Sequence, residues 1–119
     1  MSSQRQQRVA RQILHEVSSI VSRDLSDPRL EFVTFTDVHV SPDLRNARVF
    51  YSCLGGEEQR ARCAEGLAHA SGMVRRELGR RLALRFVPLL RFEHDDSGVR
   101  AARIATLLRK TGGSEGDGL

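Results

Sequence analysis

Six arginines lie within one short stretch of this 119-residue chain, and their side chains could bind phosphate groups. Residues 75–91 hold these six bases and a single acid, Glu77, so the stretch carries a charge of +5. The other thirteen bases and fourteen acids sum to −1, and Lys110 is the only lysine. A guanidinium group presents a planar fork of donors to a phosphate and a flat face to a base. The stretch therefore favours contact with a nucleic-acid backbone.

A predicted helix positions most of these arginines. The apolar residues of the run recur at four-residue spacing: Val74, Leu78 and Leu82. At about 100° per residue, Arg76 and Arg80 point away from that apolar side, while Arg75 and Arg81 flank it. We expect RNA to be bound by Arg75, Arg76, Arg80, Arg81 and Arg85. The alternative is a solvated helix face that only improves solubility.

The aromatic residues give less support for base stacking. They are Phe32, Phe35, Phe50, Tyr51, Phe86 and Phe92, and all of them fall in predicted strands. Packing in the core is the commoner role of such side chains. We therefore expect no aromatic platform of the kind on which single-stranded bases stack.

The remaining reactive side chains do not indicate catalysis or a metal site. Cys53 and Cys63 lack the spacing of a zinc-binding pair, and we expect two reduced, partly buried thiols. The acids in residues 94–96 are better explained as helix caps. The glycine pair at 55–56 indicates a turn, because no lysine of a phosphate loop follows it. We expect no catalytic residue, no metal, no cofactor and no enzyme activity.

Length and composition indicate one ordinary globular domain. Hydrophobic residues make up 39% and charged residues 29% of the chain. No apolar stretch approaches the ~20 residues that cross a bilayer, and the first residues lack the apolar region of a secretory signal. We expect a cytoplasmic monomer with no membrane partner and no small-molecule substrate. The domain is expected at residues 1–110, followed by a disordered tail at 111–119.

The first half of the chain predicts a helix followed by a hairpin. Apolar residues recur at helical spacing over residues 4–25: Val9, Ile13, Val17, Ile20 and Val21. Residues 27–28, Asp-Pro, end that helix because the position before proline is pushed out of the helical region. Strands at 31–41 and 47–54 follow, joined by a turn. The apolar residues change from one side of the first strand to the other, and a bulge or twist near residues 36–37 would reconcile the two halves.

The second half predicts two helical runs, a strand and a last helix. The runs at 57–69 and 73–83 are interrupted at Ser71-Gly72, where we expect a kink or a tight joint between helices, since glycine inside a helix costs ~1 kcal/mol relative to alanine. A third strand at about 84–94 contains Pro88, which favours an edge position or a bulge. The last helix is expected at 98–109. The order α-β-β-α-α-β-α predicts an α+β domain with helices on one face of a three-stranded sheet.

Seven segments, in sequence order, share one resemblance. They are residues 8–10, 25–30 (Leu25-Ser26-Asp27-Pro28-Arg29-Leu30), 32–41, 43–49, 70–72, 88–95 and 104–108. Together they resemble the ribosome-binding factor A family. Ala70, Ser71 and Gly72 stand where that family has an interhelical kink in place of the Gly-x-x-Gly loop of ordinary KH domains. The resemblance implies a single KH-like (type II) domain, α-β-β-α-(kink)-α-β-α.

The resemblance also implies a function. Members of the family bind the free small (30S) ribosomal subunit or its precursor, contact 16S rRNA and assist late maturation and processing of 16S rRNA. They are assembly factors and not nucleases. Without a Gly-x-x-Gly loop, recognition of RNA shape and backbone is favoured over recognition of sequence. A second hypothesis from the charge alone is a protein-interaction domain with an acidic protein partner.

Overall fold

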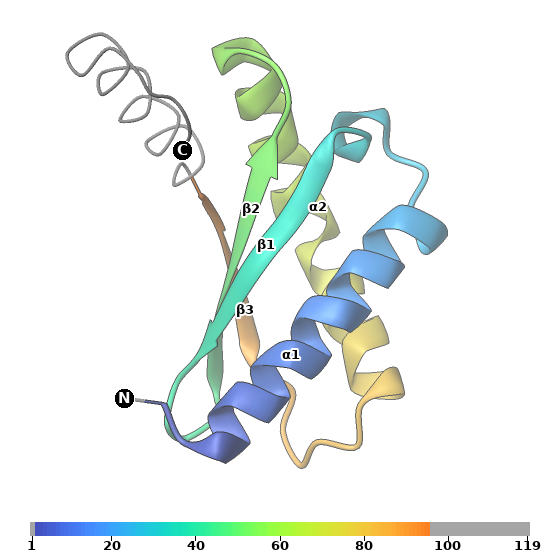
Figure 1. Ribbon diagram of the computed structural model, residues 1–119. Coiled ribbons are helices and arrows are strands. Elements are labelled where there is room, and N and C mark those ends of the chain that lie inside the picture. The colour runs from blue at the N-terminus through green and yellow to red at the C-terminus, as the bar shows by residue number, and fades with distance from the viewer. Residues whose placement is uncertain (1, 96–119) are drawn as a thin grey trace, which may run out of the picture.

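The computed structural model describes residues 2–95, in which two long helices lie on one side of a three-stranded sheet (Figure 1). The long elements follow in the order α1, β1, β2, α2 and β3. The predicted α+β class and the sheet covered on one face are thereby confirmed. The last helix predicted at 98–109 and the tail at 111–119 lie outside the described residues. No helix among residues 2–95 is long and apolar enough to cross a membrane.

Helix α1 (Gln4–Ser19) continues as a π-helical stretch, η1 (Ile20–Asp24), and together they match the helix predicted at 4–25. Ser3 caps its beginning, because the Gln6 backbone N–H donates to Ser3 Oγ and the Ser3 N–H donates to the Gln6 side chain. The predicted apolar stripe is buried in full: Val9, Ile13, Val17, Ile20 and Val21. The periodicity of the sequence therefore identified the face of α1 that meets the core.

Strands β1 (Val33–Val40) and β2 (Asn46–Cys53) pair as an antiparallel hairpin. The pairing register shifts around Thr36, so the bulge predicted near this residue is confirmed. The extra residue reverses the parity of the strand and brings Val38 and Val40 to the buried side.

Helix α2 (Glu57–Arg81) is unbroken, so a joint between two separate helices, one of the two predicted alternatives, is wrong. Gly72 lies within it, exposed, and a Cβ added there would meet no atom within 4 Å. The ~1 kcal/mol cost of one helical glycine is outweighed by the packing of the apolar residues on both sides of it. These buried residues are Cys63, Leu67, Val74 and Leu78. The kink proposed at Ala70, Ser71 and Gly72 stays a prediction about the bending of this one helix.

Two other glycines of α2 allow close contacts with neighbouring segments. A Cβ on Gly66 would lie 3.0 Å from Leu30 Cδ2, in the 3₁₀ helix η2 (Pro28–Leu30). A Cβ on Gly79 would lie 2.7 Å from Val87 Cγ2. The absence of a side chain at these two positions therefore lets α2 pack closely against η2 and against the segment that precedes β3.

Strand β3 (Leu89–His94) lies parallel to β2 at the edge of the sheet, in the strand order β1-β2-β3. The edge position agrees with Pro88, which directly precedes the strand and has no N–H to donate. The predicted start at residue 84 is wrong. Residues 82–88 instead form a loop, in which the Val87 and Pro88 carbonyl oxygens accept hydrogen bonds from the Arg75 side chain.

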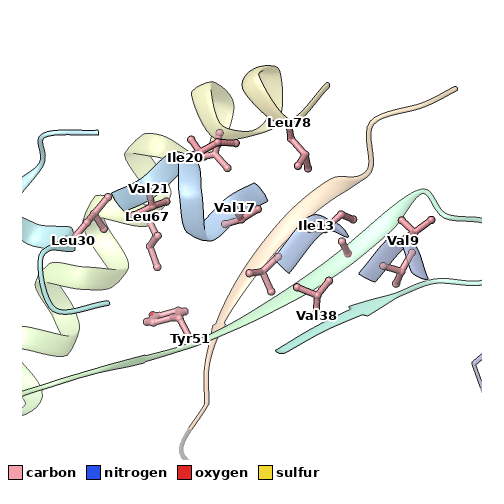
Figure 2. Close-up of a cluster of buried hydrophobic side chains, with 14 of the residues drawn as sticks. Val9, Ile13, Val17, Ile20, Val21, Leu30, Val38, Tyr51, Leu67 and Leu78 are labelled. Carbon is pink, nitrogen blue, oxygen red and sulfur yellow. The ribbon is translucent and has the colours of Figure 1, made fainter. Parts of the chain in front are cut away.

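The core lies between the helices and the inner face of the sheet. Figure 2 shows side chains of α1, α2 and β2 gathered there, among them Ile13, Val17, Leu67, Leu78 and Tyr51. Ile13 and Leu78 have no exposed surface. Full burial of one such side chain contributes about 1.5–3 kcal/mol, so the core fixes how α1 and α2 lie on the sheet.

Cys53 at the end of β2 and Cys63 in α2 are joined as a disulfide. The prediction of two reduced thiols is therefore wrong. The turn after β2 is short, so α2 begins beside the strand and its second turn returns to Cys53. Sequence spacing alone gave no signal for this pairing, since ten residues separate the two cysteines along the chain.

Candidate nucleic-acid interface

Arg76 and Arg80 form the solvent-facing part of the arginine surface predicted on α2. Both residues are exposed, and the Arg80 side chain retains 78% of its accessible surface. Arg80 Nη1 lies 3.2 Å from Glu77 Oε2, an exposed pair of the kind that contributes little to stability. Within residues 2–95, Arg76 makes no hydrogen bond or ion pair. Both guanidinium groups can therefore meet a phosphate without breaking a buried contact.

Arg81 has a different environment, in which its side chain holds α2 against α1. Its guanidinium group donates to carboxylates of Glu16, Asp24 and Glu77 and to the Ser19 hydroxyl. These contacts leave 27% of the side chain exposed. The hydrogen bond to Glu16, followed by that to Glu77, raises the pKa of Arg81 above its ordinary value. Arg81 therefore offers less positive charge to a ligand than Arg76 or Arg80.

Arg75 joins α2 to the segment that leads into β3. Its Nε donates to the Pro88 carbonyl oxygen at 3.1 Å and its Nη2 donates to the Val87 carbonyl oxygen at 2.9 Å. Carbonyl groups are neutral partners, so the guanidinium keeps its charge. The residue thus has a structural contact and remains exposed at the surface.

Arg85 lies in the loop between α2 and β3, next to an exposed ring. The guanidinium carbon of Arg85 is 5.6 Å from the centroid of Phe86, and that of Arg45 is 4.9 Å from the same centroid. Phe86 is 55% exposed and lies outside the strands, so its predicted place in a strand is wrong. The structure brings Arg45 to Arg85 although forty residues separate them in the sequence.

The outer face of the sheet carries residues that the prediction assigned to no site. Arg48 and Phe50 of β2 face away from the helices, and the guanidinium carbon of Arg48 is 5.0 Å from the Phe50 ring centroid. The signal was present in the sequence, because both alternate with the buried residues Ala47, Val49 and Tyr51. The prediction that aromatic residues in strands pack in the core did not distinguish Phe50, which faces outward, from Tyr51, which is buried.

The proposed kink residues lie in the middle of α2. Ala70 and Ser71 are half-buried and Gly72 is exposed, one turn before Arg75 and Arg76. They accompany the arginine surface along the helix, but none of them adds a charged group to it.

Asp27, Arg29 and Glu65 form an ion-pair cluster at the opposite part of α2. Arg29 Nη2 lies 2.7 Å from Asp27 Oδ2, and Arg29 Nη1 lies 3.1 Å from Glu65 Oε1. Hydrogen bonds from the Arg29 side chain lower the pKa of Asp27 from its usual 3.8 to about 2. The cluster anchors η2 to α2, which makes it a structural element rather than a surface for phosphate.

No group of three or more His, Cys, Asp or Glu side chains able to hold a metal ion occurs in the described part of the chain. The candidate interface instead consists of arginines with aromatic neighbours, and such side chains are suited to binding phosphates and bases.

Comparison with known proteins decides the family. The family model described as ribosome-binding factor A matches residues 5–108. The chain belongs to the ribosome-binding factor A family. The ribosome-binding factor A of Acetivibrio thermocellus is 43% identical over 109 residues, which cover 91% of this chain and 89% of the relative. That of Thioalkalivibrio sulfidiphilus is 45% identical over 106 residues, with 89% of this chain and 82% of the relative covered.

Solved structures of the ribosome-binding factor A family show the same fold. The crystal structure of ribosome-binding factor A from Thermus thermophilus matches with a TM-score of 0.67 at 25% identity, covering 75% of this chain and 94% of that one. A solution structure of a Thermotoga maritima protein matches with a TM-score of 0.69 at 34% identity, covering 78% and 89%. The resemblance inferred from the seven segments is thereby confirmed.

A third structural match concerns a complex. It is a homology model of the Thermus thermophilus ribosome-binding factor A fitted into the cryo-EM map of a 30S complex, with a TM-score of 0.58 at 24% identity over 81% of this chain and 97% of that one. At this identity the match supports the fold alone. The name of the ribosome-binding factor A family describes binding and no reaction.

Proposed function

We propose that this chain is a non-enzymatic assembly factor that binds the free 30S subunit, or its precursor, through 16S rRNA. In this role it assists late maturation and processing of 16S rRNA. The observation that carries the proposal is the pair of solvent-facing guanidinium groups of Arg76 and Arg80 on α2, in a chain of the ribosome-binding factor A family. The choice of subunit follows the family: this chain belongs to the ribosome-binding factor A family, and a Thermus thermophilus member of that family is described in a complex with the 30S subunit.

The physical mechanism is binding energy without catalysis. Each arginine that neutralises a phosphate releases counterions from the RNA, and this release drives association at low salt. A rigid helix that holds several guanidinium groups in fixed positions favours one arrangement of the phosphates over others. Arg76 and Arg80 are the principal contacts, Arg85 extends them beyond the end of α2, and Arg75 and Arg81 contribute less because of their internal contacts.

The predicted cytoplasmic location and monomeric state belong to this proposal. A factor that acts on free subunits meets them where they are assembled. The proposed contacts all come from one chain, so the proposal requires no second copy.

Fractionation of a cell lysate on a sucrose gradient tests the proposal. The tagged chain should co-migrate with free 30S subunits and be absent from 70S ribosomes. Digestion of the RNA before pull-down should release it, because the partner is rRNA. A chain that stays at the top of the gradient contradicts the proposal, and a partner that survives digestion instead supports an acidic protein.

A further inference from the structure

The outer face of the sheet is open within residues 2–95, since both helices lie on the other side (Figure 1). Pairing of the strands sets three outward residues in one row: His39 of β1, Arg48 of β2 and Arg91 of β3. All three are exposed. A sheet face left uncovered by helices can present its side chains to a ligand.

The most accessible ring near this face is Phe86. It is 55% exposed, and two guanidinium groups lie over it, those of Arg45 at 4.9 Å and Arg85 at 5.6 Å from the ring centroid. The Leu89 N–H donates to the Arg45 carbonyl oxygen, which fixes the loop carrying Phe86 beside the beginning of β2. Leu89 itself is 60% exposed. We call Arg45, Arg85, Phe86 and Leu89 the Phe86 corner.

A second ring, Phe50, lies further along the outer face. The His39 ring meets it edge-on at 5.0 Å between centroids, and the Arg48 guanidinium lies 5.0 Å from its centroid. Phe50 is half-buried by these neighbours. An aromatic and cationic surface thus continues from the Phe86 corner across the sheet.

Some of the positively charged side chains of this surface form ion pairs, and others do not. Arg48 pairs with Glu93, and His39 pairs with Asp37. Arg45, Arg85 and Arg91 make no ion pair within the described residues. The surface therefore has an excess of positive charge around its exposed ring, which complements a negatively charged ligand.

The Phe86 corner also adjoins the arginine surface of α2. Residues 82–88 connect the two, and Arg75 binds the carbonyl oxygens of Val87 and Pro88 in that loop. Arg80 is the next-to-last residue of α2, and Arg85 follows in this loop, four residues after the helix ends.

We propose that the Phe86 corner binds an unpaired segment of RNA, with a base stacked on Phe86 and phosphates held by Arg45 and Arg85. The inference rests on the proposed function and adds the ligand class: single-stranded RNA joined to the structured region that α2 contacts. Stacking on an exposed ring flanked by cations is the usual way in which proteins hold unpaired bases, and it tolerates any base. Bases within a duplex cannot stack on the ring because their faces are covered by neighbouring pairs.

Binding of two labelled RNAs to the full chain tests this inference. One is a mixed-sequence single strand, and the other is a duplex that contains the same strand. We expect Phe86→Leu to weaken single-strand binding by about tenfold, the range for loss of one stacked base, and to leave duplex binding unchanged. The salt dependence of binding should keep its slope, because leucine removes no phosphate contact.

Phe32→Leu is the matched control. Phe32 is 47% exposed but lies before β1, and no arginine of the described residues is placed over its ring. Its replacement should leave both affinities unchanged. Since both phenylalanines are exposed, the two variants should unfold at nearly the same temperature as the original chain.

Three outcomes overturn the inference. If the original chain does not bind the single strand, the Phe86 corner is rejected, whereas the proposed function is judged separately by co-migration with 30S subunits. If the original chain binds both RNAs and Phe86→Leu behaves as Phe32→Leu does, the corner is rejected while the proposed function stands. If Phe86→Leu weakens binding to the 30S subunit but not to the single strand, the corner contacts a ribosomal protein instead.

Discussion

Arg80 and Arg81 are neighbours in the sequence, yet their side chains have different roles. Arg80 extends into solvent with 78% of its side chain exposed, whereas Arg81 is held by three carboxylates from α1, η1 and α2. The helical periodicity correctly assigned Arg80 to the outward side. It could not show that α1 and η1 place Glu16 and Asp24 beside Arg81, because these contacts depend on how segments far apart in the sequence pack together.

At the same scale, Asp27 makes stability depend on pH. Its pKa is lowered to about 2 from 3.8 by hydrogen bonds from Arg29, so the ionised form stabilises the folded state. This contribution is fully present above about pH 4 and is lost as the pH falls through about 2. We expect Asp27→Asn to destabilise the chain at pH 7 and to have little effect near pH 2. Urea unfolding of both chains at each pH measures the difference.

If the free energies of unfolding of the original chain and Asp27→Asn differ by the same amount at pH 2 and pH 7, this account is contradicted. Such a result would mean that the carboxylate charge of Asp27 contributes nothing, and that the side chain acts only through its shape and its hydrogen bond to the Arg29 backbone N–H.

At the scale of elements, the glycines of α2 divide into those with a packing role and one without. Gly66 lies against η2, whereas Gly72 faces open space. Alanine at either position gains ~1 kcal/mol of helix propensity. At Gly66 the added methyl group also meets Leu30 Cδ2 at 3.0 Å and Arg29 Cβ at 3.1 Å, and overpacking of this kind costs about 1–3 kcal/mol.

We therefore expect Gly72→Ala to be about 1–3 kcal/mol more stable than Gly66→Ala in chemical denaturation. Equal stabilities would show that the chain around η2 relaxes freely. If Gly72→Ala is stable but binds 30S subunits poorly, bending of α2 at residues 70–72 has a function, as the family resemblance implies.

The sequence predicted which helices and strands form better than it predicted where they begin and end or what they contact. The stripe of α1, the bulge at Thr36 and the edge position of β3 follow from local rules of periodicity and proline chemistry, and all were found. The unbroken α2 and the late start of β3 depend on long-range contacts. Packing on both sides of Gly72 keeps the helix intact, and the Arg75 side chain holds the loop before β3 through the Val87 and Pro88 carbonyl groups.

At the scale of the whole molecule, the helices cover one face of the sheet and leave the other open (Figure 1). The arginine excess of residues 75–91 is distributed over α2, the loop that follows it and β3. The candidate site was therefore predicted in part. Its helix arginines could be found from charge and periodicity, but Arg45 and Phe86 could not, because only the fold brings them together.

The central claim is that Arg76 and Arg80 bind rRNA phosphates. It is tested most directly by measuring the affinity for purified 30S subunits over a range of salt concentrations. The double variant Arg76→Glu, Arg80→Glu is compared with Arg60→Glu, Arg62→Glu, which makes the same charge change on exposed residues nearer the beginning of α2. Circular dichroism should show that both variants keep the fold.

The account predicts that the Arg76 and Arg80 variant binds at least about tenfold more weakly, and that its log–log salt slope falls by about 1.4–1.8, the contribution of two phosphate contacts. The control variant should keep most of its affinity and its slope. Equal affinities and equal slopes for the two double variants would contradict the claim that this helix surface binds the RNA.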